Sequence, residues 1–240
     1  TVDSLEATAM PTKYVVSERV GAHGGAFKEI AVVERAEYMA KVTDNEIHSY
    51  RIQAMNDGGR SFPSEVLSLG VAPNSKGTAM VVNAFTRVSA PDWVDEGDFA
   101  TFTDETDHGV PYIQGINYIG SQYEKRRSAG WSDARGGFGS SHSDYEGAVI
   151  AGNTFDFPAV HGESLMAAGY SFVSTSVKAV EQGVAKLEGY KVLDIIAGKQ
   201  KETKVGYGAY PSKYKLLSPA LMQAVENATK TGANVLLTGA

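Results

Sequence analysis

The segment 48–55 alternates strictly between two kinds of side chain. Tyr50, Ile52 and Ala54 fall on one face, and the polar residues between them fall on the other. A period of two with a polar outer face is typical of a half-buried antiparallel strand. The turn sequence Asn-Asp-Gly-Gly follows at 56–59, and a second apolar run follows at 65–70. Since Asn and Gly tolerate a positive φ, this pattern predicts a β-hairpin.

Shorter β-branched runs at 14–16 and 30–33 predict two further strands before the hairpin. The polar Pro/Gly/Ser stretch 72–77 follows the hairpin and is typical of a linker. Residues 1–72 are therefore expected to form an all-β module. A full sandwich of this type needs about seven strands over roughly 100 residues, so we expect the first strands to be missing.

Beyond the linker the pattern changes to apolar strands separated by amphipathic helices. Strands are predicted at 79–84, 170–174, 190–197 and 234–238, and helices at 112–127, 164–168, 176–187 and from Ser218 to Gly232. Ser218-Pro219 has the residue types of an N-cap followed by the first helical position. Apolar strands between such helices indicate a parallel sheet covered on both faces. The sequence thus predicts two domains, an incomplete β-sandwich followed by a Rossmann-like α/β domain over 77–240 that is itself incomplete at its C-terminus.

Composition narrows the possible functions of these domains. The 240 residues contain 22 Lys and Arg against 28 Asp and Glu, for a net charge of -6, which disfavours nucleic acid as a partner. No apolar run is long enough to span a membrane. The absence of cysteine excludes disulfides and thiolate catalysis. The phosphate loop, the dinucleotide fingerprint, the nucleophile elbow and the zincin motif are absent, so we expect neither cofactor nor metal.

The stretch 85–169 is far longer than a βα crossover requires and is a candidate functional insertion. Within it His161 or His142 could act with Asp156 or Asp144 as an acid–base or orienting pair. These four residues could equally hold turn and loop backbone through hydrogen bonds. The candidate catalytic residues are therefore His161, Asp156 and His142.

A second group of polar residues falls near the predicted strand ends. Ligands of parallel sheets bind beyond the carboxyl ends of the strands, which places Asn83, Arg87, Lys199 and Gln200 as candidate binding residues. The alternative interpretation is that these polar residues only end the strands and bind nothing. If a ligand binds, we expect these residues to meet His161 and Asp156 beneath the insertion.

Residues 50–66, Tyr-Arg-Ile-Gln-Ala-Met-Asn-Asp-Gly-Gly-Arg-Ser-Phe-Pro-Ser-Glu-Val, resemble the last hairpin of a fibronectin type III domain. That resemblance implies that Tyr50 is a packed core tyrosine. Three later stretches, at 107–120, 150–162 and 168–172, look like a family of large secreted proteins of Bacteroides-type bacteria. Members are commonly labelled xanthan lyase or N-acetylmuramoyl-L-alanine amidase, and they combine fibronectin type III and Rossmann-like modules.

This resemblance implies an extracytoplasmic location (periplasmic, outer-membrane-associated or secreted) and a cell-wall or polysaccharide ligand. We expect the chain to be a fragment of an envelope-associated hydrolase acting on peptidoglycan or a related polysaccharide. In that hypothesis the fragment supplies a spacer and an α/β module and is inactive alone. One alternative is a non-catalytic surface protein that binds glycan or acts as a scaffold, and another makes the long insertion an active site. The sequence leaves the oligomeric state open.

Overall fold

The computed structural model describes residues 10–21, 25–61, 63–85, 93–95, 98–102, 125–126, 157–198, 203–205, 210–214 and 216–239. The chain divides into two compact units. The first consists of residues 1–84, 151–197 and 217–238, and the second of residues 85–150, 198–216 and 239–240. Each unit is described by itself below, and every candidate site residue with a described side chain belongs to the first.

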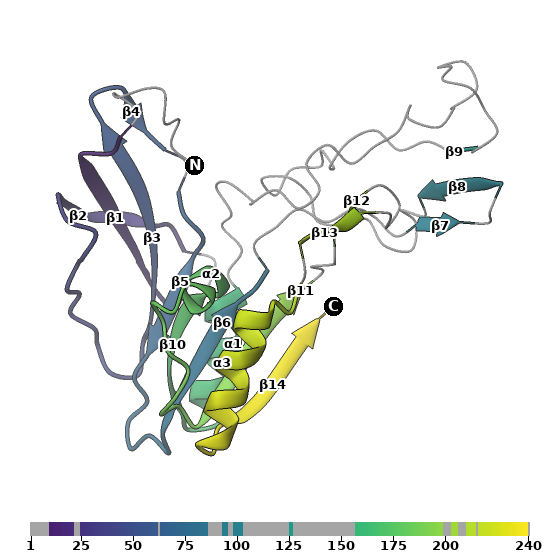
Figure 1. Ribbon diagram of the computed structural model, residues 1–240. Coiled ribbons are helices and arrows are strands. Elements are labelled where there is room, and N and C mark those ends of the chain that lie inside the picture. Colours follow the sequence, from purple (N-terminus) through teal and green to yellow (C-terminus); the bar gives the residue numbers. More distant parts are fainter. Residues whose placement is uncertain are drawn as a thin grey trace. The chain divides into compact units, whose positions relative to one another are not determined.

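The main sheet of the described residues has nine strands in the order β14-β11-β6-β10-β5-β3-β1-β2, with β4 paired to β3 (Figure 1). Its strands are β1 (Lys13–Val20), β2 (Lys28–Val33), β3 (Ile47–Asn56), β4 (Gly59–Arg60), β5 (Leu67–Gly70), β6 (Thr78–Asn83), β10 (Ser171–Ser176), β11 (Val192–Gly198) and β14 (Asn234–Gly239). Its helices are α1 (Phe157–Ala167), α2 (Val177–Glu181) and α3 (Pro219–Lys230).

The first half of the sheet is antiparallel, as the alternating pattern predicted. β1 pairs with β3 from Lys13↔Met55 to Val20↔His48, and β2 pairs with the other edge of β1. The β3–β4 hairpin turns at Asp57-Gly58, where Asn56 Oδ1 accepts a hydrogen bond from the Gly58 amide at 2.9 Å. The turn is confirmed, but the strand directly after it is β4. The predicted partner run pairs antiparallel with the start of β3 as β5, from Ile47↔Gly70 to Tyr50↔Leu67.

The second half is parallel. Ser171–Ser176 of β10 and Val192–Ile196 of β11 lie on either side of Thr78–Asn83 of β6, with Ser176 and Ile196 both opposite Asn83. β14 lies beyond β11, and Asn234 bonds to Lys191 while Thr238 bonds to Ile195, so these two strands run in the same direction. The apolar strands predicted after residue 77 thus form a parallel array.

The predicted division into a β-sandwich followed by a Rossmann-like domain is wrong. The two halves form one mixed sheet, because the free edge of β5 pairs antiparallel with β10 at Gly70↔Phe172. The junction is reinforced where Ser174 Oγ accepts from the Ser68 amide and donates to the Ser68 carbonyl, both at 2.6 Å. A hairpin signature specifies two strands and a turn, but it does not specify which neighbour covers the outer edge.

Helices cover opposite faces of the parallel half. Met80 and Val82 of β6 pack with Val177 and Val180 of α2 and Leu221 of α3 in one core cluster. On the other face, a second cluster joins alternate strand residues to Ala159 of α1; its buried members are Ile47, Ala79, Val81, Ala159, Phe172 and Ile196. Strand alternation therefore assigns the odd-numbered residues of β6 to the face that carries α1.

The helices differ in length from those predicted. α3 begins as expected, with Ser218 as N-cap accepting from the Leu221 amide at 3.2 Å. α2 ends at Glu181, far short of residue 187, because Gly183 takes a positive φ of 71° and ends the helix. α1 begins seven residues earlier than predicted, at Phe157.

The second unit contains two small antiparallel sheets among its described residues. One consists of β7 (Trp93–Asp95), β8 (Phe99–Phe102) and β9 (Lys125–Arg126), and the other of β12 (Thr203–Val205) and β13 (Tyr210–Tyr214). Lys125–Arg126 is therefore strand, where the sequence predicted the end of a helix. The rest of that predicted helix lies outside the described residues.

Candidate acid–base site

α1 packs against the sheet at Gly162, a residue without a side chain. A Cβ added at Gly162 would lie 2.1 Å from Cζ of Phe172, so only glycine lets the Phe172 ring pack against this turn of the helix. Phe172 is 1% exposed and belongs to the core cluster on this face. This close approach fixes the position of the neighbouring residue, His161.

His161 forms a hydrogen-bonded pair with Asp194 of β11. Nδ1 of His161 lies 2.7 Å from Oδ2 of Asp194. The Asp194 side chain is 2% exposed and the His161 side chain 24% exposed, so the carboxylate is buried and the imidazole reaches partly into solvent. An ionised carboxylate only accepts hydrogen bonds, which places a proton on Nδ1 and leaves Nε2 as the second functional nitrogen of the ring.

The second oxygen of Asp194, Oδ1, is buried and has no hydrogen-bond partner among the described residues. A buried carboxylate that accepts one hydrogen bond has most of its charge uncompensated. The positive charge that His161 gains on protonation would be stabilised by this carboxylate. The geometry is that of an orienting Asp behind a general base.

A second pair lies at the exit end of β6. Nδ2 of Asn83 donates to Oε2 of Glu65 at 2.6 Å, and Asn83 itself is 3% exposed. Burial raises the pKa of Glu65 to about 7, and the hydrogen bond from Asn83 opposes this shift only in part. Glu65 therefore exchanges its proton near neutrality, where an acid–base catalyst is most effective.

Strand register brings the two pairs to the same region. Asn83 follows Ala79 and Val81 on the α1 face of β6, and Asp194 lies between Val192 and Ile196, which also pack on that face. Asn83 is opposite Ile196, two residues beyond Asp194 on the neighbouring strand. From strand spacing and rise, the Cα atoms of Asn83 and Asp194 are roughly 8 Å apart.

Of the residues predicted from the sequence, Asn83 and His161 have described side chains, and both lie on the α1 face. His161 stands on α1, where the sequence suggested an insertion loop, and its carboxylate partner in the structure is Asp194. The other candidates, Asp156, His142, Arg87, Lys199 and Gln200, lie outside the described residues. Whether those five reach the same region stays a prediction.

Asp194 and Glu65 were missed by the sequence analysis. A usable signal existed for Asp194, because it is the one charged residue in the apolar run 192–197. A charge inside a buried strand is rare unless it is paired, and so marks a functional or structural pair. No comparable signal marks Glu65, whose hydrogen-bond partner Asn83 lies 18 residues further along the chain.

A different network in the antiparallel half has a structural explanation. His48 Nδ1 donates to Glu18 at 2.9 Å, and its Nε2 accepts from the Thr43 amide at 3.0 Å, so both ring nitrogens are occupied. Tyr50 donates to the same Glu18 oxygen at 2.7 Å. Burial opposes ionisation of Glu18, but these two hydrogen bonds outweigh it and lower the pKa of Glu18. This network fixes side chains between β1 and β3 and leaves no free proton acceptor on the imidazole.

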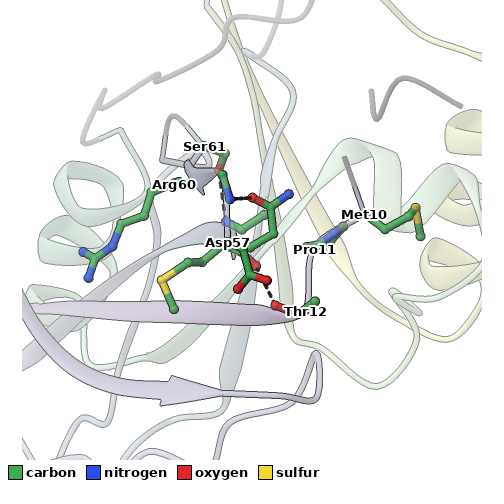
Figure 2. Close-up of a pocket in the computed structure, with 11 residues that line it drawn as sticks. Met10, Pro11, Thr12, Asp57, Arg60 and Ser61 are labelled. Atoms are coloured by element: carbon green, nitrogen blue, oxygen red, sulfur yellow. Dashed lines mark hydrogen bonds between the residues drawn. The ribbon is translucent and has the colours of Figure 1, made fainter. Parts of the chain in front are cut away.

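A cavity of about 530 Å³ lies beside the β3–β4 turn. Its lining residues come from the segments 10–12 and 54–61, and in Figure 2 Arg60 extends away from the other labelled side chains. Arg60 also forms an ion pair with Glu29. With no buried ionisable group among its lining residues, this cavity is a weaker candidate than the two pairs on the α1 face.

The described side chains contain no cluster of three or more His, Cys, Asp or Glu that could hold a metal ion. Within the same residues, no helix is long and apolar enough to cross a membrane. What the α1 face presents is proton-transfer chemistry: an imidazole held by a buried carboxylate, and a second carboxyl that titrates near neutrality. A scan against protein-family models gives no match, and neither does a search of curated proteins.

Proposed function

We propose that the chain is part of an exported, envelope-associated hydrolase acting on peptidoglycan or a related polysaccharide, with His161 as a general base oriented by Asp194. The observation that supports this proposal is the 2.7 Å contact between a partly exposed imidazole and a carboxylate that is 2% exposed. Exported location and substrate class rest on the sequence resemblance. The sequence led us to expect a fragment that is inactive alone, and the pair changes this expectation, because it gives this stretch of chain a general base of its own.

In this proposal Asp194 keeps the proton on Nδ1, so the lone pair of Nε2 faces the substrate side of the ring. Nε2 takes a proton from a water molecule as that water attacks the scissile bond. The buried carboxylate then stabilises the imidazolium. A positioned base of this kind contributes typically 10²–10⁴-fold to a rate.

A non-catalytic glycan-binding role is the second candidate. The Asn83–Glu65 pair favours it, because amide and carboxyl groups at a strand exit are suited to hydrogen bonds with sugar hydroxyl groups. The two candidates differ in whether ligand is consumed. They can therefore be separated in one assay.

The test incubates the 240-residue chain with peptidoglycan sacculi and with acidic polysaccharides between pH 5 and 9, and follows release of reducing ends and free amines. We expect product from the wild type and a loss of roughly 10²–10⁴-fold in His161→Gln and Asp194→Asn. His48→Gln is the matched control, since it alters the other His–carboxylate pair of the sheet. Binding of these polymers without release of product would favour the glycan-binding role and refute the hydrolase.

A further inference from the structure

The two pairs on the α1 face, His161–Asp194 and Glu65–Asn83, have the same arrangement of hydrogen bonds. In each, a buried partner fixes one atom of an ionisable side chain: Asp194 holds Nδ1 of His161, and Asn83 holds Oε2 of Glu65. The opposite atoms, Nε2 of His161 and Oε1 of Glu65, have no hydrogen-bond partner among the described residues. Each group is therefore positioned through one atom and can exchange a proton through the other.

Glu18 is another carboxyl of the same sheet, and it shows that a raised pKa is not general there. Glu18 receives two donors, Tyr50 and His48, which hold it as a carboxylate. Glu65 receives a single neutral donor and is more strongly desolvated, so its pKa rises to about 7. A carboxyl that is protonated near neutrality can donate a proton, which Glu18 cannot.

We propose that Glu65 is the general acid that complements His161, and that the substrate bond has an oxygen or nitrogen leaving group that requires protonation. The inference rests on the proposed function and adds the residue that acts on the leaving group. Its geometric basis is that the anchors of the two groups, Asn83 and Asp194, are diagonal neighbours on adjacent strands. The Cα atoms of these anchors are roughly 8 Å apart, and in the proposal the scissile bond and a water lie between the two ionisable groups that they hold.

The proton balance of the step is complete. Nε2 of His161 takes a proton from water, and the resulting hydroxide oxygen bonds to the electrophilic carbon. The bond between that carbon and the leaving atom breaks, and the proton on Glu65 moves to the leaving atom. The proton on His161 then returns through solvent to the Glu65 carboxylate, so one water is consumed and both side chains regain their starting states.

The experiment compares Glu65→Gln with the wild type on two kinds of substrate. On sacculi and acidic polysaccharides, whose leaving groups need a proton, we expect a loss of roughly 10²–10⁴-fold. On nitrophenyl glycosides and nitrophenyl esters, whose nitrophenolate leaving group departs without protonation, we expect the variant to keep most of the wild-type rate. A merely structural Glu65 would lower both rates alike, and that result would overturn the inference.

The pH profile provides a second readout. The wild-type rate should fall as pH rises through about 7, because Glu65 loses its proton, and this fall should be absent in Glu65→Gln. The hydrogen bond from Asn83 lowers the pKa of Glu65, so Asn83→Ala should move the fall to higher pH. Glu188→Gln, which changes an exposed carboxyl, is the control. Reducing ends and free amines as separate readouts distinguish an oxygen from a nitrogen leaving group.

The outcomes separate the two proposals. A wild-type chain that is inactive on every substrate overturns the proposed function and this inference with it. An active wild type whose rate and pH profile are unchanged in Glu65→Gln overturns only the inference. Far-UV circular dichroism of each variant confirms folding, and Gln can still accept the hydrogen bond from Asn83.

Discussion

Glu65→Gln should change the pH dependence of folding stability. The pKa of Glu65 is about 7 in the folded chain against an ordinary value of 4.5. Between these two values the folded state binds more protons than the unfolded state, so the free energy of unfolding falls as pH rises. The contribution is fully present below pH 4.5 and is lost by slightly above pH 7. Gln carries no such charge and should show no loss.

The size of the change in unfolding free energy follows from the size of the pKa shift of Glu65. A change from 4.5 to about 7 corresponds to about 3 kcal/mol of unfolding free energy at 1.36 kcal/mol per pKa unit. At pH 4 the wild type and Glu65→Gln should agree to within about 0.5 kcal/mol, because the carboxyl is protonated in both states. At pH 8 the variant should be the more stable by about 3 kcal/mol.

The measurement is urea unfolding of both proteins at several pH values between 4 and 8, followed by circular dichroism. Taking the difference between wild type and variant at each pH cancels every other titrating group that the two proteins share. Glu188→Gln provides the comparison with an exposed carboxyl. A difference between wild type and Glu65→Gln that stays constant with pH would refute the reasoning.

Two further predictions concern α1 and α3. Gly162→Ala should lower the free energy of unfolding by about 1–3 kcal/mol, since the new methyl group overlaps Phe172; a melting temperature at or above the wild-type value would contradict this packing. Ser218→Ala should lower it by about 1 kcal/mol through loss of the N-cap, and Ser218→Asp should retain most of the stability, which thermal melts of the two variants would compare.

Local patterns predicted most strands of the main sheet, because each depends on a few neighbouring residues. The hairpin turn at 56–59 and the Ser218-Pro219 helix start are examples, since turn and cap chemistry act within four residues. What the sequence did not predict is how the strands join. The pairing of Gly70 with Phe172 connects residues about a hundred positions apart, and no short-range pattern encodes it.

The same limit explains the errors at single residues. Ser49 was expected on the solvent face of its strand but is fully buried. Its hydroxyl lies 2.8 Å from that of Ser68 and accepts from Arg19 at 3.1 Å, so its polarity is satisfied inside the sheet. In the candidate site, His161 and Asn83 were predicted from residue type and position, and their site roles stay predictions. Their partners depend on the register between strands and on how α1 packs.

The central position of β6 has a consequence for the synthesis of the protein. Both neighbours of β6 come much later in the chain: β6 ends at Asn83, whereas β10 begins at Ser171 and β11 at Val192. At roughly 5–20 residues per second, a ribosome takes about 4–18 s to reach β10 after completing β6. During that interval the apolar segment Thr78–Asn83 has no strand to pair with. We therefore expect nascent chains halted before residue 171 to bind chaperones, and chains halted well beyond β11 to be released from them, which pull-down of stalled ribosomes would test.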